Sequence, residues 1–223
     1  MFSSLEEIRV RADALYAARD RWENVRASLA LLQAADAPHD YEVDWRLGRA
    51  LFFLGQEAQD KSDARAYHTR GAQASARAAR LEPERVEGYF WLGVNLALLA
   101  RLENPFHGLR HALRARRELE RAARIDPAHH AAGPLRVLGR LQHKLPRFFG
   151  GGITRARASF ERAIEIAPAN TVTRLYFAEM LLETGEADQA RIQLEAILNI
   201  ADDPAWAFEI KRDRRIARDL LKR

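Results

Sequence analysis

The sequence predicts an all-α protein, an α-solenoid of about five stacked helical hairpins, and three observations lead to that prediction. Apolar residues recur at helical spacing along the 223 residues, and no stretch alternates as a β-strand would. Leu-Gly pairs recur at 47–48, 92–93 and 138–139. Each pair is followed by small, large and small residues and then a proline, as expected where two helices approach closely. We therefore expect one superhelical domain over residues 1–223.

The first helices are predicted over residues 5–18 and 22–35, within an N-terminal capping hairpin at 1–38. This hairpin matches the repeat pattern only loosely, as terminal repeats do. Its docking positions are Tyr16, Val25, Leu29 and Leu32. The regular repeats are expected over residues 40–200.

The second hairpin is longer than a minimal repeat. Leu47 and Gly71 are 24 residues apart, whereas a minimal repeat needs about 13 over that interval. The middle helices must therefore be lengthened. The polar run at 59–63 is the expected turn, with Ser62 or Asp63 as the N-cap of the following helix.

The third and fifth hairpins follow the same plan. Asn104 is predicted as an N-cap and Pro105 as the first residue of a long arginine-bearing helix that runs to Arg124. The fifth hairpin has no insertion and fits a complete 34-residue repeat. Asp203-Pro204 then interrupts the helical pattern before a C-terminal capping helix at 204–223.

The fourth hairpin carries an aromatic, glycine-rich insert at 144–152, too long for a minimal turn. We expect a tight turn with Thr154 as N-cap and the Phe148-Phe149 pair anchoring the insert. Free backbone donors at the triple glycine form an alternative phosphate site, although the lysine and serine or threonine order of a P-loop is absent.

The repeated small and large positions are those of a tetratricopeptide (TPR) hairpin. The motifs Trp45-Arg-Leu-Gly48, Tyr89-Phe-Trp-Leu-Gly93 and Leu138-Gly-Arg140, with the insert and Ala156-Arg-Ala-Ser-Phe160, stand in a distinctive order. That order resembles the TPR-like domain of the regulator of microtubule dynamics family. It also resembles TatT, a periplasmic lipoprotein found with some bacterial TRAP transporters. The resemblance implies a binding scaffold with an apolar channel that associates with a solute-binding subunit.

In a TPR superhelix the first helix of each hairpin lines the concave face, which gives a candidate groove. This groove would be aromatic at one end and cationic at the other, and would suit a protein partner, a peptide or an amphipathic small ligand. The alternative is that the lengthened helices bury these aromatics as core. The candidate binding residues are Trp45, Arg49, Phe52, Phe53, Phe90, Val94, Arg136, Arg140, His143, Lys144, Arg147, Phe148 and Phe149.

The net charge of +5 is unevenly distributed, because residues 101–157 carry 13 basic and 4 acidic residues. A second hypothesis is therefore an arginine-rich binder of nucleic acid or anionic membrane through residues 110–124. A solvated helix face explains such a run better, so we expect no specific nucleic-acid recognition.

Histidines offer a weak metal hypothesis. His107 and His111 are one helical turn apart, but no third ligand accompanies them, so exposed side chains explain them better. His129 and His130 are expected to face solvent in an inter-repeat turn. No nucleophile-base pairing or paired carboxylates are visible, so we predict no enzyme activity, no cofactor and no metal.

The chain has no cysteine, which excludes disulfides and a lipidated cysteine. Residues 1–30 resemble neither a signal peptide nor a spanning helix. We expect a cytoplasmic protein, or a periplasmic one if a leader was removed ahead of residue 1. Homo-oligomerisation is left open.

Overall fold

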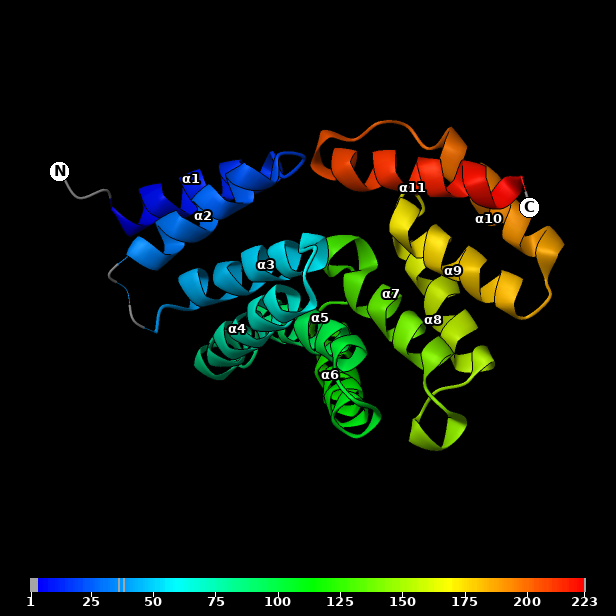
Figure 1. Ribbon diagram of the computed structural model, residues 1–223, viewed down its shortest axis with the longest axis horizontal. Coiled ribbons are helices and arrows are strands. Elements are labelled where there is room, and N and C mark those ends of the chain that lie inside the picture. Colours follow the sequence, from blue (N-terminus) through cyan, green and yellow to red (C-terminus); the bar gives the residue numbers. More distant parts are fainter. Residues whose placement is uncertain (1–3, 36, 38, 223) are drawn as a thin grey trace. The chain divides into compact units, whose positions relative to one another are not determined.

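The computed structural model describes residues 4–35, 37 and 39–222. That part of the chain is helical, with no β-strand, which confirms the all-α, TPR-like prediction (Figure 1). The α-helices are α1 Leu5–Ala17, α2 Trp22–Ala34, α3 Tyr41–Glu57, α4 Lys61–Leu81, α5 Val86–Leu102, α6 Pro105–Ile125, α7 His129–Lys144, α8 Ile153–Ile166, α9 Thr171–Glu183, α10 Ala187–Asn199 and α11 Ala207–Leu221. Two short 3-10 turns, η1 Arg147–Phe149 and η2 Pro204–Trp206, precede α8 and α11.

The chain forms two compact units, which are described separately. Unit 1 is Met1–Asp126 and unit 2 is Pro127–Arg223. The single superhelical domain stays a prediction. Parts of both predicted capping segments, at residues 1–3, 36, 38 and 223, lie outside the described residues.

Unit 1 contains three helical hairpins, and the second and third are lengthened as predicted. Helices α4 and α6 are each 21 residues long, and both pack on α5. Asn104 caps α6 and Pro105 begins it, as expected. The predicted N-cap of α4 was wrong: the Asp60 side chain accepts hydrogen bonds from the Ser62 and Asp63 backbones, because Lys61 already begins the helix.

The glycines of the Leu-Gly pairs lie against neighbouring helices, which confirms the repeat register. A Cβ atom added at Gly48 would lie 2.0 Å from Ser75 Oγ, and one at Gly93 would lie 2.5 Å from Leu119 Cγ. In unit 2, a Cβ atom at Gly139 would lie 2.7 Å from the ring of Phe160. Larger side chains at these positions would push the two helices of a hairpin apart.

Unit 2 packs α7 to α11 around an aromatic and aliphatic core. The rings of Phe160 on α8 and Phe177 on α9 stack with centroids 5.6 Å apart. Helix α11 adds Ala217 to a cluster with Leu175 and Leu194. The helices are interrupted before α11 as predicted, and there the Asp203 side chain accepts a hydrogen bond from the Ala205 backbone in η2.

The first turn of α7 differs from the prediction of a solvent-facing turn. His130, Ala131 and Ala132 have left-handed backbone conformations, with φ of 51°, 53° and 57°. His129 and His130 are half-buried, and the His130 ring lies 4.8 Å from that of Trp206. Left-handed conformations cost free energy for residues other than glycine. The surrounding contacts must therefore stabilise this turn.

A buried polar pair joins three helices of unit 1. The Asn95 side chain on α5 donates hydrogen bonds to the carbonyls of Gly48 (3.1 Å) and Trp91 (2.8 Å). Its Oδ1 atom is therefore free to accept from His68 Nδ1 on α4, at 3.1 Å. His68 is 2% exposed, and this burial lowers the pKa of its imidazole although the Asn95 bond works against the change.

The pH dependence of stability tests this pair. Because the pKa of His68 is lower in the folded chain, the unfolded chain binds a proton first as the pH falls below about 6.5. Stability should therefore be fully present above that pH and fall below it, by up to about 1.4 kcal/mol per pH unit. Urea denaturation of His68→Gln between pH 7.5 and 5 should show a shallower pH dependence than the unmodified chain. His107→Gln, at an exposed position, should keep the original slope, and equal slopes for all three would contradict the prediction.

Candidate functional site

The structure divides the predicted groove residues of unit 1 into two groups. Trp45, Arg49 and Phe52 are half-buried and reach the surface of α3. Phe53, Phe90 and Val94 are between 1% and 4% exposed. For these three the prediction of an open groove surface was wrong, because neighbouring helices cover them. Phe53, for example, packs edge-on against Tyr16 of α1 at 6.2 Å.

The exposed edge of Trp45 lies in a network of arginines and acids. The guanidinium carbons of Arg46 and Arg49 are 4.2 Å and 5.0 Å from the centre of a Trp45 ring. Both arginines pair with Asp13 of α1, at 2.8 Å and 2.5 Å. Burial acts to raise the pKa of Asp13, but the Arg46 hydrogen bonds and the charge of Arg49 outweigh it and lower the pKa. This surface is therefore held in place before any ligand arrives.

In unit 2 the predicted cationic end is balanced by acids of α9. Arg140 pairs with Glu179 at 2.7 Å. Glu183 pairs with Lys144 at 2.6 Å and with His143 at 3.0 Å. The hydrogen bond from Lys144 is the main reason that the pKa of Glu183 is lowered. The prediction of a simple cationic surface was therefore wrong, because α9 packs beside α7 and supplies two carboxylates.

Arg136 is a structural residue rather than a surface one. It is 5% exposed, and burial lowers its pKa to about 10. Its Nη1 atom donates to the carbonyl oxygens of Ala131 (2.9 Å) and His130 (3.4 Å) and to Asn170 Oδ1 (3.4 Å). It therefore satisfies the carbonyls of the left-handed turn.

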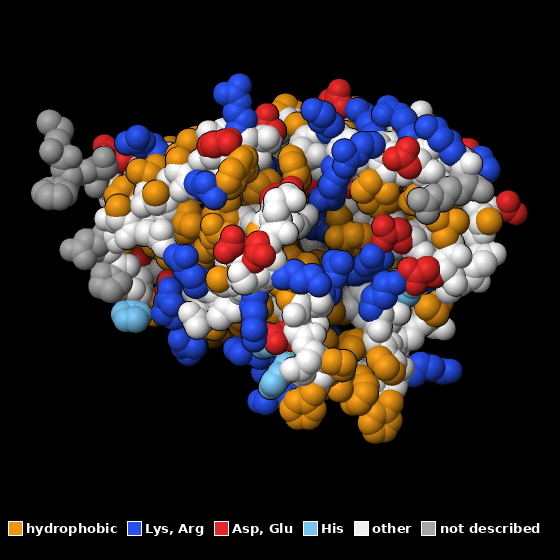
Figure 2. Space-filling view, in the orientation of Figure 1, with side chains coloured by type: hydrophobic (Ala, Val, Ile, Leu, Met, Phe, Trp, Pro, Cys, Tyr) orange, Lys and Arg blue, Asp and Glu red, His pale blue; other side chains and the backbone are white. Residues whose placement is uncertain are grey.

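The insert projects from unit 2 as a compact turn, and hydrophobic side chains protrude from it (Figures 1 and 2). Backbone bonds anchor it: Gly151 N donates to the Pro146 carbonyl at 3.1 Å, and Gly152 N to the Gln142 carbonyl at 2.8 Å. A Cβ atom at Gly151 would lie 1.8 Å from the Leu145 oxygen, so only glycine fits there.

The side chains of the insert have different roles from those predicted. Phe148 is 91% exposed and does not anchor the insert, whereas Phe149 is half-buried, with its ring 5.3 Å from that of Phe148. Arg147 is exposed beside them. Thr154 is not the N-cap, because Gly152 precedes α8 and the helix begins at Ile153.

Three of the six arginines of α6 pair with glutamates of the same helix. Arg116 pairs with Glu120 at 3.0 Å and Arg117 with Glu118 at 3.1 Å. Nowhere in the described part of the chain do three or more histidine, aspartate or glutamate side chains gather as a metal site requires. No helix within residues 4–35, 37 and 39–222 combines the length and hydropathy needed to cross a lipid bilayer.

Several residues around Trp45 and along α7 were not predicted from the sequence. Asp13 and Arg46 complete the Trp45 network, while Glu179 and Glu183 pair with α7. The spacing of Glu179 and Glu183, one turn apart on the first helix of a hairpin, places both on one helix face. That spacing was a signal that could have identified them.

Comparisons with known proteins agree with the fold. The family model described as "TRAP transporter T-component" matches residues 46–223. Among solved structures, a crystal structure of a thermophilic TPR protein in Thermus thermophilus aligns with a TM-score of 0.72 at 21% sequence identity. The alignment covers 96% of this chain and 98% of that one, and at this identity it shows the fold alone. A comparison with curated proteins gives no match.

Proposed function

Because the chain belongs to the TRAP transporter T-component family, we propose that it is a non-enzymatic scaffold that binds the solute-binding subunit of a TRAP transporter. TPR-like folds of this kind are protein-binding scaffolds. Such a partner places the protein in the periplasm rather than the cytoplasm. The principal anchor in this proposal is Phe148.

One observation favours Phe148 as the principal anchor over the other candidate binding residues. Phe148 has 91% of its surface exposed, at the tip of a turn that backbone hydrogen bonds hold rigid. Large aromatic side chains supply a disproportionate share of binding energy at protein interfaces. A rigid turn also loses little conformational freedom on binding. The adjacent Arg147 adds a charged contact at the rim.

Two further surfaces supplement the anchor in the proposal. In unit 1, Trp45, Arg49 and Phe52 offer an aromatic edge flanked by guanidinium groups. In unit 2, Arg140 and Lys144 offer cations that already have carboxylate partners. Exposed pairs of this kind contribute little net binding energy but restrict which partners fit.

Phe148→Ser should weaken binding of a TRAP solute-binding subunit about 30-fold, because an aromatic hot spot contributes about 2 kcal/mol or more. Isothermal titration calorimetry with the two purified proteins would measure the change. The circular dichroism spectrum and melting curve should stay unchanged, because Phe148 is exposed.

Phe106→Ser provides the matched control. Phe106 is also exposed, at 70%, near the start of α6 in unit 1. The Phe106→Ser variant should bind the solute-binding subunit with unchanged affinity. Equal affinity of Phe148→Ser and the unmodified chain would reject Phe148 as the anchor. A third variant, Trp45→Ala, tests the surface of α3: a loss of affinity in this variant alone would mean that the partner binds there instead. Failure of the unmodified proteins to bind at all would reject the proposed partner.

A further inference from the structure

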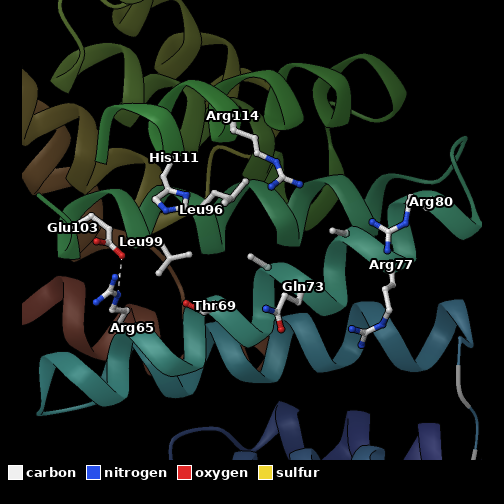
Figure 3. Close-up of a pocket in the computed structure, with 12 residues that line it drawn as sticks. Arg65, Thr69, Gln73, Arg77, Arg80, Leu96, Leu99, Glu103, His111 and Arg114 are labelled. Carbon is white, nitrogen blue, oxygen red and sulfur yellow. Dashed lines mark ion pairs between the residues drawn. The ribbon is translucent and has the colours of Figure 1, made fainter. Parts of the chain in front are cut away.

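Unit 1 contains a pocket that the proposed function does not use. It has a volume of about 600 Å³ and lies between α4 and α6, with α5 between them (Figure 3). Both α4 and α6 pack on α5. The pocket exists because α4 presents Ala72 and Ala76 here, and these short side chains leave the space between the helices unfilled.

The charges around this pocket are not balanced at one end. Arg65 pairs with Glu103 at 2.8 Å at the opposite end (Figure 3). Arg77 is directed to Asp44 of α3, at 2.6 Å. Arg80 makes no hydrogen bond or ion pair among the described residues. An uncompensated positive charge therefore faces the pocket.

A second arginine lies near the same end. Figure 3 shows Arg114 of α6 across the pocket from Arg80 of α4. The contact of Arg114 with Glu118 is long, at 3.8 Å, which leaves most of its hydrogen-bonding capacity unused. Gln73 of α4 also lines the pocket. Burial lowers the pKa of His111, so near neutral pH the positive charge of the pocket comes from the arginines.

The floor of the pocket is apolar. Leu96 and Leu99 of α5 form it, together with the methyl groups of Ala72 and Ala76. Guanidinium groups match the geometry of carboxylates, which they bind through parallel hydrogen bonds. An apolar floor beside such groups accommodates a hydrocarbon chain, because burial of that chain drives association.

We propose that this pocket binds a small organic carboxylate with an apolar chain, its carboxylate between Arg80 and Arg114 and its chain along Leu96 and Leu99. The site lies on the α4–α6 side of unit 1. It is independent of the solute-binding subunit and of Phe148.

Octanoate is the probe, with inorganic phosphate as the anion without a chain and 1-octanol as the chain without a charge. Calorimetric titration of the full chain should detect octanoate binding, with phosphate and octanol each at least about 10-fold weaker. Loss of both arginines in Arg80→Gln/Arg114→Gln should weaken octanoate binding about 30-fold or more, because charge-assisted bonds are lost. Ala76→Phe should do the same by filling the pocket while every charge remains.

The control removes two charges from the same helix outside the pocket. Arg110→Gln/Arg117→Gln should keep octanoate affinity within about twofold, because Arg110 and Arg117 are exposed and do not line the pocket. An equal loss in this control would show general electrostatic attraction and overturn the proposal. Phosphate binding as tight as octanoate binding, or no octanoate binding, would also overturn it.

Discussion

Gly88→Ala is expected to lower the free energy of unfolding by about 3 kcal/mol, at the upper end of overpacking effects. A Cβ atom at Gly88 would lie 2.5 Å from the backbone nitrogen of Ala79 and 2.8 Å from its Cα. These atoms belong to the main chain of α4 and cannot rotate away. Alanine would gain about 1 kcal/mol of helix propensity over glycine, so the steric cost must exceed that gain. Urea denaturation followed by circular dichroism would measure the difference.

Gly48→Ala is the matched comparison, because its obstacle is a side chain. The nearest atom to the new Cβ would be Ser75 Oγ, at 2.0 Å, whereas Ser75 Cβ would be 3.3 Å away. We expect Gly48→Ala to destabilise the chain, and Ser75→Ala in the same chain to recover about 1 to 2 kcal/mol. A stability for Gly88→Ala equal to or above that of the unmodified chain would contradict the close approach of α5 to α4.

Arg136→Leu is expected to cost about 3 kcal/mol of stability, because the part-buried carbonyls of Ala131 and His130 lose the donor that they share. The left-handed turn would then lack its main polar contact. The same measurement on Arg140→Leu gives the control, four residues along the same helix. Arg140 is 29% exposed in its pair with Glu179, and a pair of this exposure contributes less than about 1 kcal/mol. Equal losses for the two variants would show that Arg136 does not support the turn.

The fold was predictable because its main signal repeats. Gly48 and Gly93 mark the same structural contact in two successive hairpins, and each lies against the second helix of its pair. A single pair would have been ambiguous, but a recurring spacing constrains the register of the helices. The cap at Asn104 was equally clear, because an asparagine followed by proline has a strong positional preference.

The candidate site was less predictable, because it depends on how far each helix is covered. Counting from the Leu-Gly pairs assigned Phe90 and Phe52 to one surface, yet Phe90 is buried and Phe52 only partly so. Local spacing fixes the side of a helix but not what packs against it. Likewise, the basic run of α7 gave no indication that Glu179 and Glu183 would neutralise it, since those residues are distant in sequence.

In the insert at 144–152, the residues that determine the backbone shape are not the residues whose side chains are exposed. Its shape depends on two glycines and on main-chain carbonyls, so the exposed side chains at positions 147 and 148 have little influence on folding. The exposed side chains of Arg147 and Phe148 can therefore be exchanged while the glycines stay. In this arrangement, a change in the displayed side chains requires no redesign of the helical framework.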